Sequence, residues 1–324
     1  MLTLRDRWVW DSWVADDGET YHLFYLQAPR ALDDPALRHT RATIGHATSR
    51  DLVDWEVHDD ALVPAEVGWD DLSLWTGSVV RGDDGRWRMF YTALTTARGH
   101  EVRDQQVGVA ESDDLFTWHR ARPDALLPAG GGTYQTLPED PSASETWRDP
   151  FVFRDAGGDG WHMLVTARLT GAGRLDDGTV AHARSADLES WELQPPVTGD
   201  PAGFGQLEVP QVRMVGDRPV LVFTCHPQEQ SEARRAEHGH FCTWSVVGEP
   251  GGSLLGPWDL HRAVPFTAEP TLFAAPLVQR RDGSWVLVGF RNQEPEGIWS
   301  FDIIDPVPVR IENGGLAADP TTPR

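Results

Sequence analysis

A hairpin signal recurs five times in this chain of 324 residues and constrains its fold more than any other feature. Each copy is a two-residue turn of glycine and aspartate followed by an apolar or aromatic run. The runs cover residues 21–25, 87–91, 161–165, 219–223 and 285–289. Glycine and aspartate tolerate the positive φ angles of tight turns, so each copy predicts two antiparallel strands. Five such hairpins, spread along the whole chain, indicate a repetitive all-β fold.

A second element, Asp-Leu-x-x-Trp, follows the first three hairpins. Its copies cover residues 51–55, 114–118 and 187–191, and residues 257–260 resemble a decayed fourth copy. We interpret its tryptophans as packing residues. Five repeats, each long enough for four strands, predict a five-bladed β-propeller with four antiparallel strands per blade. A β-sandwich is the alternative, but it requires no such recurring motif.

The repeats divide the chain into blades but not into domains. We expect one catalytic domain over residues 1–324, without a C-terminal β-sandwich. The blades should cover roughly residues 8–60, 70–120, 145–195, 203–262 and 268–305. Residues 130–132 and 138–144 have the composition of a long inter-blade loop, and we expect the chain after Glu312 to be frayed.

Charge and composition exclude several classes of function. The net charge of −22 disfavours nucleic acids and anionic membranes as partners, and we expect a neutral, small carbohydrate substrate instead. No stretch is apolar enough to span a membrane, and the first residues lack the apolar core of a signal peptide, so a cytoplasmic location is expected. The two cysteines and scattered histidines predict neither a disulfide nor a metal site, and no cofactor motif is present. The oligomeric state stays open.

Three carboxylates occupy corresponding positions in the repeats. The strand before each hairpin should be the innermost of its blade, and innermost strands converge on the propeller axis. Asp11, Asp149 and Glu208 lie near the starts of three such strands. Singly, each has an ordinary explanation; Asp149, for example, precedes Pro150 as many turn residues do. Together they predict one acidic pocket.

Such a pocket has the chemistry of glycoside cleavage. Mutual repulsion and burial raise the pKa of at least one carboxyl, and a raised glutamate can act as a general acid at neutral pH while an aspartate stays ionised. Glycosidases use such a pair on the two sides of the scissile bond. Trp10, Trp13 and Trp75 flank the acids and offer apolar faces to a sugar ring. Arg148 and Ser78 are candidates for binding its hydroxyls.

With these residues, the chain resembles the fructan-active glycoside hydrolases of families 32 and 68. Residues 21–25 with Gln27, residues 45–47 and residues 51–55 are similar to the first blade of family 32, and the resemblance implies that Gln27 binds substrate. Residues 75–78 are similar to its Ser-Gly-Ser segment, and residues 147–150 to its Arg-Asp-Pro motif. Residues 9–13 are more similar to levansucrase, and Glu208-Val-Pro replaces the Glu-Cys-Pro of family 32.

The resemblance implies roles for the three acids. Asp11 would be the nucleophile, Asp149 would stabilise the transition state, and Glu208 would be the acid/base of a retaining β-fructofuranosidase acting on sucrose or fructans. Hydrolysis and fructosyl transfer both stay open. Two alternatives also stay open: an inverting arabinosidase or xylosidase of the family 43 type, and a carbohydrate-binding propeller without catalysis. The carboxylate separation distinguishes the first, at about 5–5.5 Å for retention and about 6.5–9.5 Å for inversion.

Overall fold

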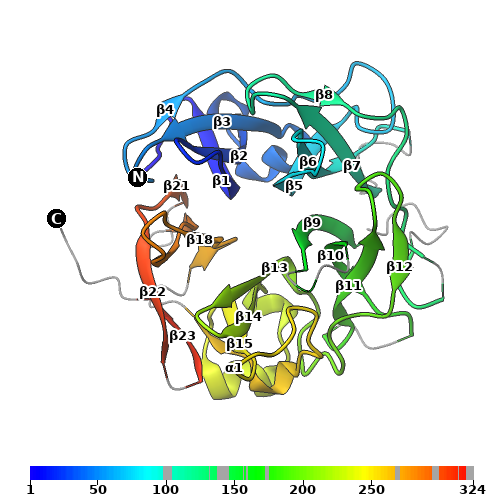
Figure 1. Ribbon diagram of the computed structural model, residues 1–324, viewed down its shortest axis with the longest axis vertical. Coiled ribbons are helices and arrows are strands. Elements are labelled where there is room, and N and C mark those ends of the chain that lie inside the picture. The colour runs from blue at the N-terminus through cyan, green and yellow to red at the C-terminus, as the bar shows by residue number, and fades with distance from the viewer. Residues whose placement is uncertain are drawn as a thin grey trace.

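A computed structural model describes most of the chain and shows an all-β protein. The described residues are 1–97, 104–130, 132–136, 146–155, 157, 160–171, 175–266, 271–293, 299–312 and 314–318. The sheets are arranged in a ring around a central axis (Figure 1). Within these ranges the one α-helix is α1 (Glu232–His238), and no helix is long and apolar enough to cross a membrane. The loop predicted at 138–144 lies outside the described residues, as does Gly131.

Four sheets of four antiparallel strands follow one another along the chain, each in the simple order of its strands. The first holds β1 (Arg7–Asp16), β2 (Tyr21–Pro29), β3 (Thr43–Ser49) and β4 (Glu56–Val57). The second holds β5 (Ser73–Arg81), β6 (Trp87–Leu94), β7 (Gln105–Ser112) and β8 (His119–Arg120). The third holds β9 (Trp147–Arg154), β10 (Trp161–Arg168), β11 (Gly178–Ser185) and β12 (Glu192–Gln194). The fourth holds β13 (Glu208–Val215), β14 (Arg218–Thr224), β15 (Thr243–Val247) and β16 (Val264–Pro265).

The last part of the chain departs from the predicted single four-stranded blade, because it forms two sheets. One has the order β17-β20-β21 and the other the order β18-β19-β22-β23. These strands are β17 (Leu272–Phe273), β18 (Leu277–Gln279), β19 (Trp285–Leu287), β20 (Phe290–Gln293), β21 (Trp299–Ile303), β22 (Val307–Glu312) and β23 (Gly315–Ala318). The expectation of a frayed chain after Glu312 is therefore wrong for residues 315–318. Leu316 is buried there, and its N–H bonds the Ser245 hydroxyl.

The split has a local cause. Between β17 and β18 the backbone of Ala274 has a φ of +40°, and Pro276 has no N–H to donate to a neighbouring strand. The two sheets nevertheless stay joined by backbone hydrogen bonds. Val288 donates to the Pro276 carbonyl at 3.0 Å, and Ile304 donates to the Gly289 carbonyl at 2.9 Å. The strands of the two sheets are therefore joined end to end.

Aromatic contacts between neighbouring sheets explain the Asp-Leu-x-x-Trp repeat. Trp118 packs edge-on against Phe24 of the first sheet at 5.6 Å between ring centroids, and Trp191 packs in the same way against Phe90 of the second sheet. The second and third motifs therefore tie their own sheets to the preceding ones. This agrees with the interpretation of these tryptophans as packing residues.

The leucines of the three motifs adopt an unusual backbone. Leu52, Leu115 and Leu188 have φ angles of 68°, 66° and 67°, a region that non-glycine residues rarely enter. The preceding aspartate offsets this strain, since one carboxylate oxygen accepts the N–H groups of the two residues that follow the leucine. The leucine side chains are buried. The motif is thus a capped turn between the third and fourth strands.

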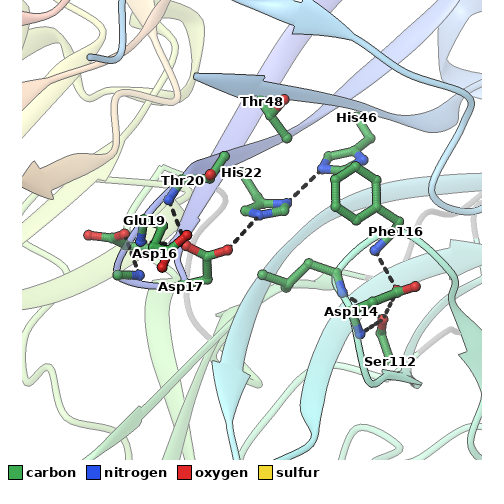
Figure 2. A network of polar contacts seen from close by, with 12 residues as sticks. Asp16, Asp17, Glu19, Thr20, His22, His46, Thr48, Ser112, Asp114 and Phe116 are labelled. Carbon is green, nitrogen blue, oxygen red and sulfur yellow. Dashed lines mark hydrogen bonds and ion pairs between the residues drawn. The ribbon is translucent and has the colours of Figure 1, made fainter. Parts of the chain in front are cut away.

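A polar chain lies where the first two sheets meet (Figure 2). The Asp17 carboxylate contacts His22 at 3.4 Å, and the ring of His22 contacts that of His46 at 3.0 Å. Both histidines are buried, and Phe116 of the second sheet packs edge-on against both. Burial lowers the pKa of His46 to about 3 and lowers that of His22, so both rings are neutral at neutral pH.

Candidate active site

The innermost strands bring the site together. Strands β1, β5, β9 and β13 lie at the inner edges of their sheets and point toward the centre of the ring (Figure 1). Strand β5 contacts both β1 and β9, and β9 contacts β13. The starts of these strands, from different repeats, therefore meet around one axis, as the sequence predicted.

A β-bulge at the same level of each inner strand turns the backbone there. One extra residue interrupts the pairing between Trp10 and Ser12 on β1 and between Trp75 and Gly77 on β5. The interruptions on β9 and β13 follow Arg148 and Glu208. Bulges bend a strand and re-aim its side chains, and they are common beside active sites. On β1 the extra residue is Asp11 itself.

A cavity of about 540 Å³ opens at this level. Its wall contains Asp11, Asp149 and Glu208, so the structure brings the three predicted acids together. Two of the predicted aromatic residues, Trp10 and Trp75, also line it. The other lining residues are Leu26, Arg38, His39, Thr76, Gln105, Thr146, Arg148, Arg168, Gln206, His226, Gln228, Glu229, Phe273, Phe290 and Asn292.

Asp149 is the most firmly held of the acids. Its Oδ2 accepts hydrogen bonds from the Thr166 hydroxyl at 2.9 Å and from the Val209 N–H at 3.1 Å. Its own N–H donates to the Thr92 hydroxyl at 2.8 Å. Its φ of +60° is a strained conformation that the surrounding bonds maintain. Only 4% of Asp149 is exposed, so its carboxylate has one fixed direction.

Arg148 lies between two of the acids. Its Nε is 3.4 Å from Oδ2 of Asp149, and a terminal nitrogen is 3.4 Å from Oε2 of Glu208. The same guanidinium donates to the side-chain oxygens of Gln206 and Gln105. These contacts fix the guanidinium plane, and its charge offsets part of the repulsion between the carboxylates.

Burial and repulsion change the acidity of the site. Burial, reinforced by the charges of neighbouring carboxylates, raises the pKa of Asp11 to about 7 and that of Asp149 to about 6. Two groups oppose the rise at Asp11: the hydroxyl of Thr76, which donates a hydrogen bond, and the charge of Arg38. The rise in pKa falls on the two aspartates, which corrects the expectation that a glutamate is raised while an aspartate stays ionised.

Three predicted binding residues lie away from this cavity. Trp13 and Ser78 line a second cavity further along the same strands. The Ser78 hydroxyl donates to the Pro150 carbonyl at 2.7 Å and accepts the Val152 N–H at 2.9 Å, so it joins β5 to β9. Gln27 is buried and donates to the Asp60 carboxylate. For Trp13 and Ser78 the bulges are the cause, because residues beyond a bulge face a different part of the axis; Gln27 lies on β2 instead of an inner strand.

Several lining residues were not anticipated from the sequence. Thr76 is the residue of β5 that corresponds to Asp11, and Gly77 allows the bulge there, since a Cβ would lie 2.0 Å from the Phe90 carbonyl oxygen. Arg168 pairs with Glu229 at 3.0 Å on another side of the cavity. The similarity of residues 75–78 to the Ser-Gly-Ser segment of family 32 could have pointed to Thr76. Arg168 and Glu229 had none, because they come from a strand end and a loop outside the repeat pattern.

Comparisons with known proteins found both sequence relatives and solved structures with a similar fold. The family profile "Glycosyl hydrolases family 32 N-terminal domain" matches residues 13–249. A sucrose-6-phosphate hydrolase of Zymomonas mobilis is 27% identical over 294 residues, which are 85% of this chain and 51% of that protein. An insoluble β-fructofuranosidase isoenzyme of Arabidopsis thaliana is 30% identical over 59% of this chain and 32% of its own length. This chain thus spans about half or less of the length of these relatives.

Solved structures establish the fold. An inulosucrase from Halalkalicoccus jeotgali bound to kestose superposes with a TM-score of 0.77 at 22% identity, covering 97% of this chain and 87% of that chain. A sucrose-6-phosphate hydrolase from Lactobacillus gasseri gives a TM-score of 0.73 at 18% identity, covering 97% of this chain and 63% of the other.

Proposed function

The chain belongs to glycosyl hydrolase family 32, and from this we propose that it cleaves the β-fructofuranosidic bond of sucrose or of fructo-oligosaccharides with retention of configuration. The observation that carries the proposal is one cavity lined by three carboxylates from three inner strands. Enzymes that cleave glycosidic bonds need two such groups with different roles. The two hydrolase relatives carry names for this chemistry.

Asp11 is the proposed nucleophile. As the bulged residue of β1, it projects into the cavity without a pairing partner on β2. The Thr76 hydroxyl holds one carboxylate oxygen, which leaves the other to attack the anomeric carbon. The attack forms a bond from this oxygen to the anomeric carbon while the bond to the leaving oxygen breaks. With a pKa near 7, Asp11 has the charge that attack requires only at neutral pH and above.

Glu208 is the proposed acid/base. It gives a proton to the leaving oxygen in the first step and takes one from the incoming water in the second. Its side chain is 18% exposed, against 4% for Asp149. A group that exchanges protons with water must be accessible, and Glu208 meets this requirement. The Arg148 contact at 3.4 Å orients its carboxyl group.

Asp149 is the proposed transition-state stabiliser. It is buried and rigid, and two donors occupy its Oδ2. A fixed carboxylate beside the sugar ring accepts hydrogen bonds from ring hydroxyls and stabilises positive charge at the anomeric carbon. Trp10 and Trp75 add apolar wall on the other side of the cavity.

We also infer that the two last sheets together are the fifth blade of a five-bladed propeller. Their strands would fill the four strand positions of one blade. The first three positions each consist of two short strands, β17 with β18, β19 with β20 and β21 with β22, and the fourth is β23. The backbone bonds from Val288 to Pro276 and from Ile304 to Gly289 support this grouping. The N-terminus closes the ring, since Leu2 exchanges backbone bonds with Ile303 of β21 at 2.9 and 3.1 Å.

Incubation with sucrose, levan, inulin and aryl arabinofuranosides tests the proposed reaction. We expect fructose release from at least one of the first three, and loss of that release in both Asp11→Ala and Glu208→Ala. Products longer than the substrate would add fructosyl transfer to hydrolysis. Release of arabinose alone would favour an inverting arabinosidase, and activity that survives Asp11→Ala would rule out the covalent mechanism.

A further inference from the structure

A second cavity lies further along the inner strands. It has a volume of about 460 Å³, within the range of small-molecule sites. The acid cavity is lined by Trp10 and Asp11 on β1 and by Glu208 on β13, whereas the second cavity is lined by residues 12–14 and 209–214 of the same two strands. The proposed reaction uses no residue that lines this second cavity alone.

The wall of this cavity is largely apolar, and its charged residues are Asp16, Asp149, Arg154 and Arg213. Asp16 pairs with Arg281 and Arg154 pairs with Asp83, whereas Arg213 has no such partner among the described residues. Phe151, Val212 and Pro276 are among its apolar residues, and Arg213 stands over the Phe151 ring with its guanidinium carbon 4.6 Å from the ring centroid. Among the described residues no carboxylate forms an ion pair with Arg213. Burial lowers its pKa to about 10, and it is still cationic at neutral pH. Strand geometry puts its Cα roughly 15 Å from that of Glu208, too far for an ion pair with that carboxylate.

Two hydrogen-bond donors in the same wall also lack partners. Ser12 is 2% exposed and Trp13 is 5% exposed. Within the described structure the Ser12 hydroxyl and the Trp13 indole nitrogen have no hydrogen-bond partner. Buried donors without partners destabilise the fold, and an unpaired charge costs more. An anionic ligand would offset the cost of the unpaired charge of Arg213.

We propose that this second cavity binds a small organic anion, with its charged head at Arg213 and an apolar ring or short chain against Phe151 and Val212. The apolar wall favours a ligand with an apolar body. The cation without a counter-ion, Arg213, favours an anionic head group. Arg213 is half-buried and the neighbouring Met214 is exposed, so the charged head of the ligand would lie nearer to solvent than its apolar body. Asp149 lines both cavities, but the anion site proposed here does not require the proposed hydrolase reaction.

Two fluorescent probes of similar shape test the charge requirement. 8-Anilinonaphthalene-1-sulfonate carries a sulfonate on an aromatic body, and N-phenyl-1-naphthylamine has the same body without charge. We expect the wild-type protein, in its folded state, to bind the sulfonate at least tenfold more tightly than the neutral probe. Equal affinities would overturn the proposal, and this comparison needs no variant.

Matched variants test the location. Arg213→Gln should weaken sulfonate binding at least tenfold, whereas Arg154→Gln should not, because Arg154 lines the same cavity but pairs with Asp83. Asp11→Asn should keep sulfonate binding while losing hydrolysis, so failure of one proposal leaves the other standing. Saturating sucrose should not displace the probe. Displacement by sucrose, or unchanged binding in Arg213→Gln, would show that the second cavity is not the site.

Discussion

The hydroxyl of Thr76 on β5 donates a hydrogen bond to Oδ2 of Asp11 on β1, so two neighbouring inner strands share one polar contact at their bulges. The bond stabilises the ionised form of Asp11 and opposes the rise in pKa that burial causes. Thr76 is thus a positioning residue for the proposed nucleophile. It also links the acidity of Asp11 to the packing of two repeats.

Thr76→Val should shift the pH dependence of the reaction. Loss of the donor raises the pKa of Asp11 above its value of about 7, and the shift should be about one pH unit. Since kcat/KM reports the free enzyme, its acidic limb should move to higher pH, and its value at pH 6 should fall about tenfold. Thr76→Ser should restore the wild-type profile. A lower kcat/KM with an unmoved limb would contradict this role.

Asp11→Asn should abolish activity and stabilise the fold at alkaline pH. A carboxyl whose pKa is raised from 3.8 to about 7 keeps its proton longer in the folded state. The wild type therefore loses stability from this group as the pH rises from about 4 to 7. At pH 8 the variant should be more stable by on the order of 1 kcal/mol. Urea unfolding at pH 5 and pH 8 measures the difference in unfolding free energy between the variant and the wild type. The same difference at both pH values would contradict the burial of the Asp11 charge.

Arg148→Met should impair the transition state more than substrate binding. Removal of the guanidinium leaves Asp149 and Glu208 without their shared cation, and kcat/KM should fall by roughly 100-fold or more. Arg148→Lys should recover only part of the loss, because one ammonium group cannot reproduce the separate contacts of Nε and the terminal nitrogens. Steady-state kinetics measure kcat and KM of both variants, and thermal unfolding checks that each variant is folded. Near-normal kcat in Arg148→Met would argue against the proposed arrangement.

His46→Gln should reduce the sensitivity of the fold to acid. The pKa of His46 is lowered from 6.5 to about 3, so the unfolded chain takes up the proton first. Its contribution to stability is complete above pH 6.5 and is lost as the pH falls toward 3. Between pH 7 and pH 5 the variant should lose about 2 kcal/mol less than the wild type. Parallel stability curves for the two proteins would show that His46 is not buried as a neutral ring.

The repeats made much of this protein predictable from sequence. Hairpin turns between aromatic runs are local signals, and they gave the four complete sheets. Alignment of the repeats then selected Asp11, Asp149 and Glu208, which the structure gathers in one cavity. This worked because equivalent strands meet at the axis, so equivalence in sequence becomes proximity in space.

Bulges and breaks were not predictable, because they depend on the partner strand. A single extra residue on β5 turns Ser78 away from the acids and toward the β9 backbone, and Trp13 likewise lies beyond the bulge of β1. The last blade is divided near Ala274 and Pro276, which the hairpin signal at residues 282–289 does not reveal. Gln27 was selected by family resemblance alone, and its amide bonds Asp60.

The stereochemistry of methanolysis tests the central claim most directly. Sucrose cleaved in buffer that contains methanol yields a methyl fructofuranoside, whose anomeric configuration is stable and is read by nuclear magnetic resonance. Attack by Asp11 followed by attack of methanol inverts the anomeric carbon twice, so the account predicts the β anomer. Formation of the α anomer would mean a single displacement and would contradict Asp11 as the nucleophile.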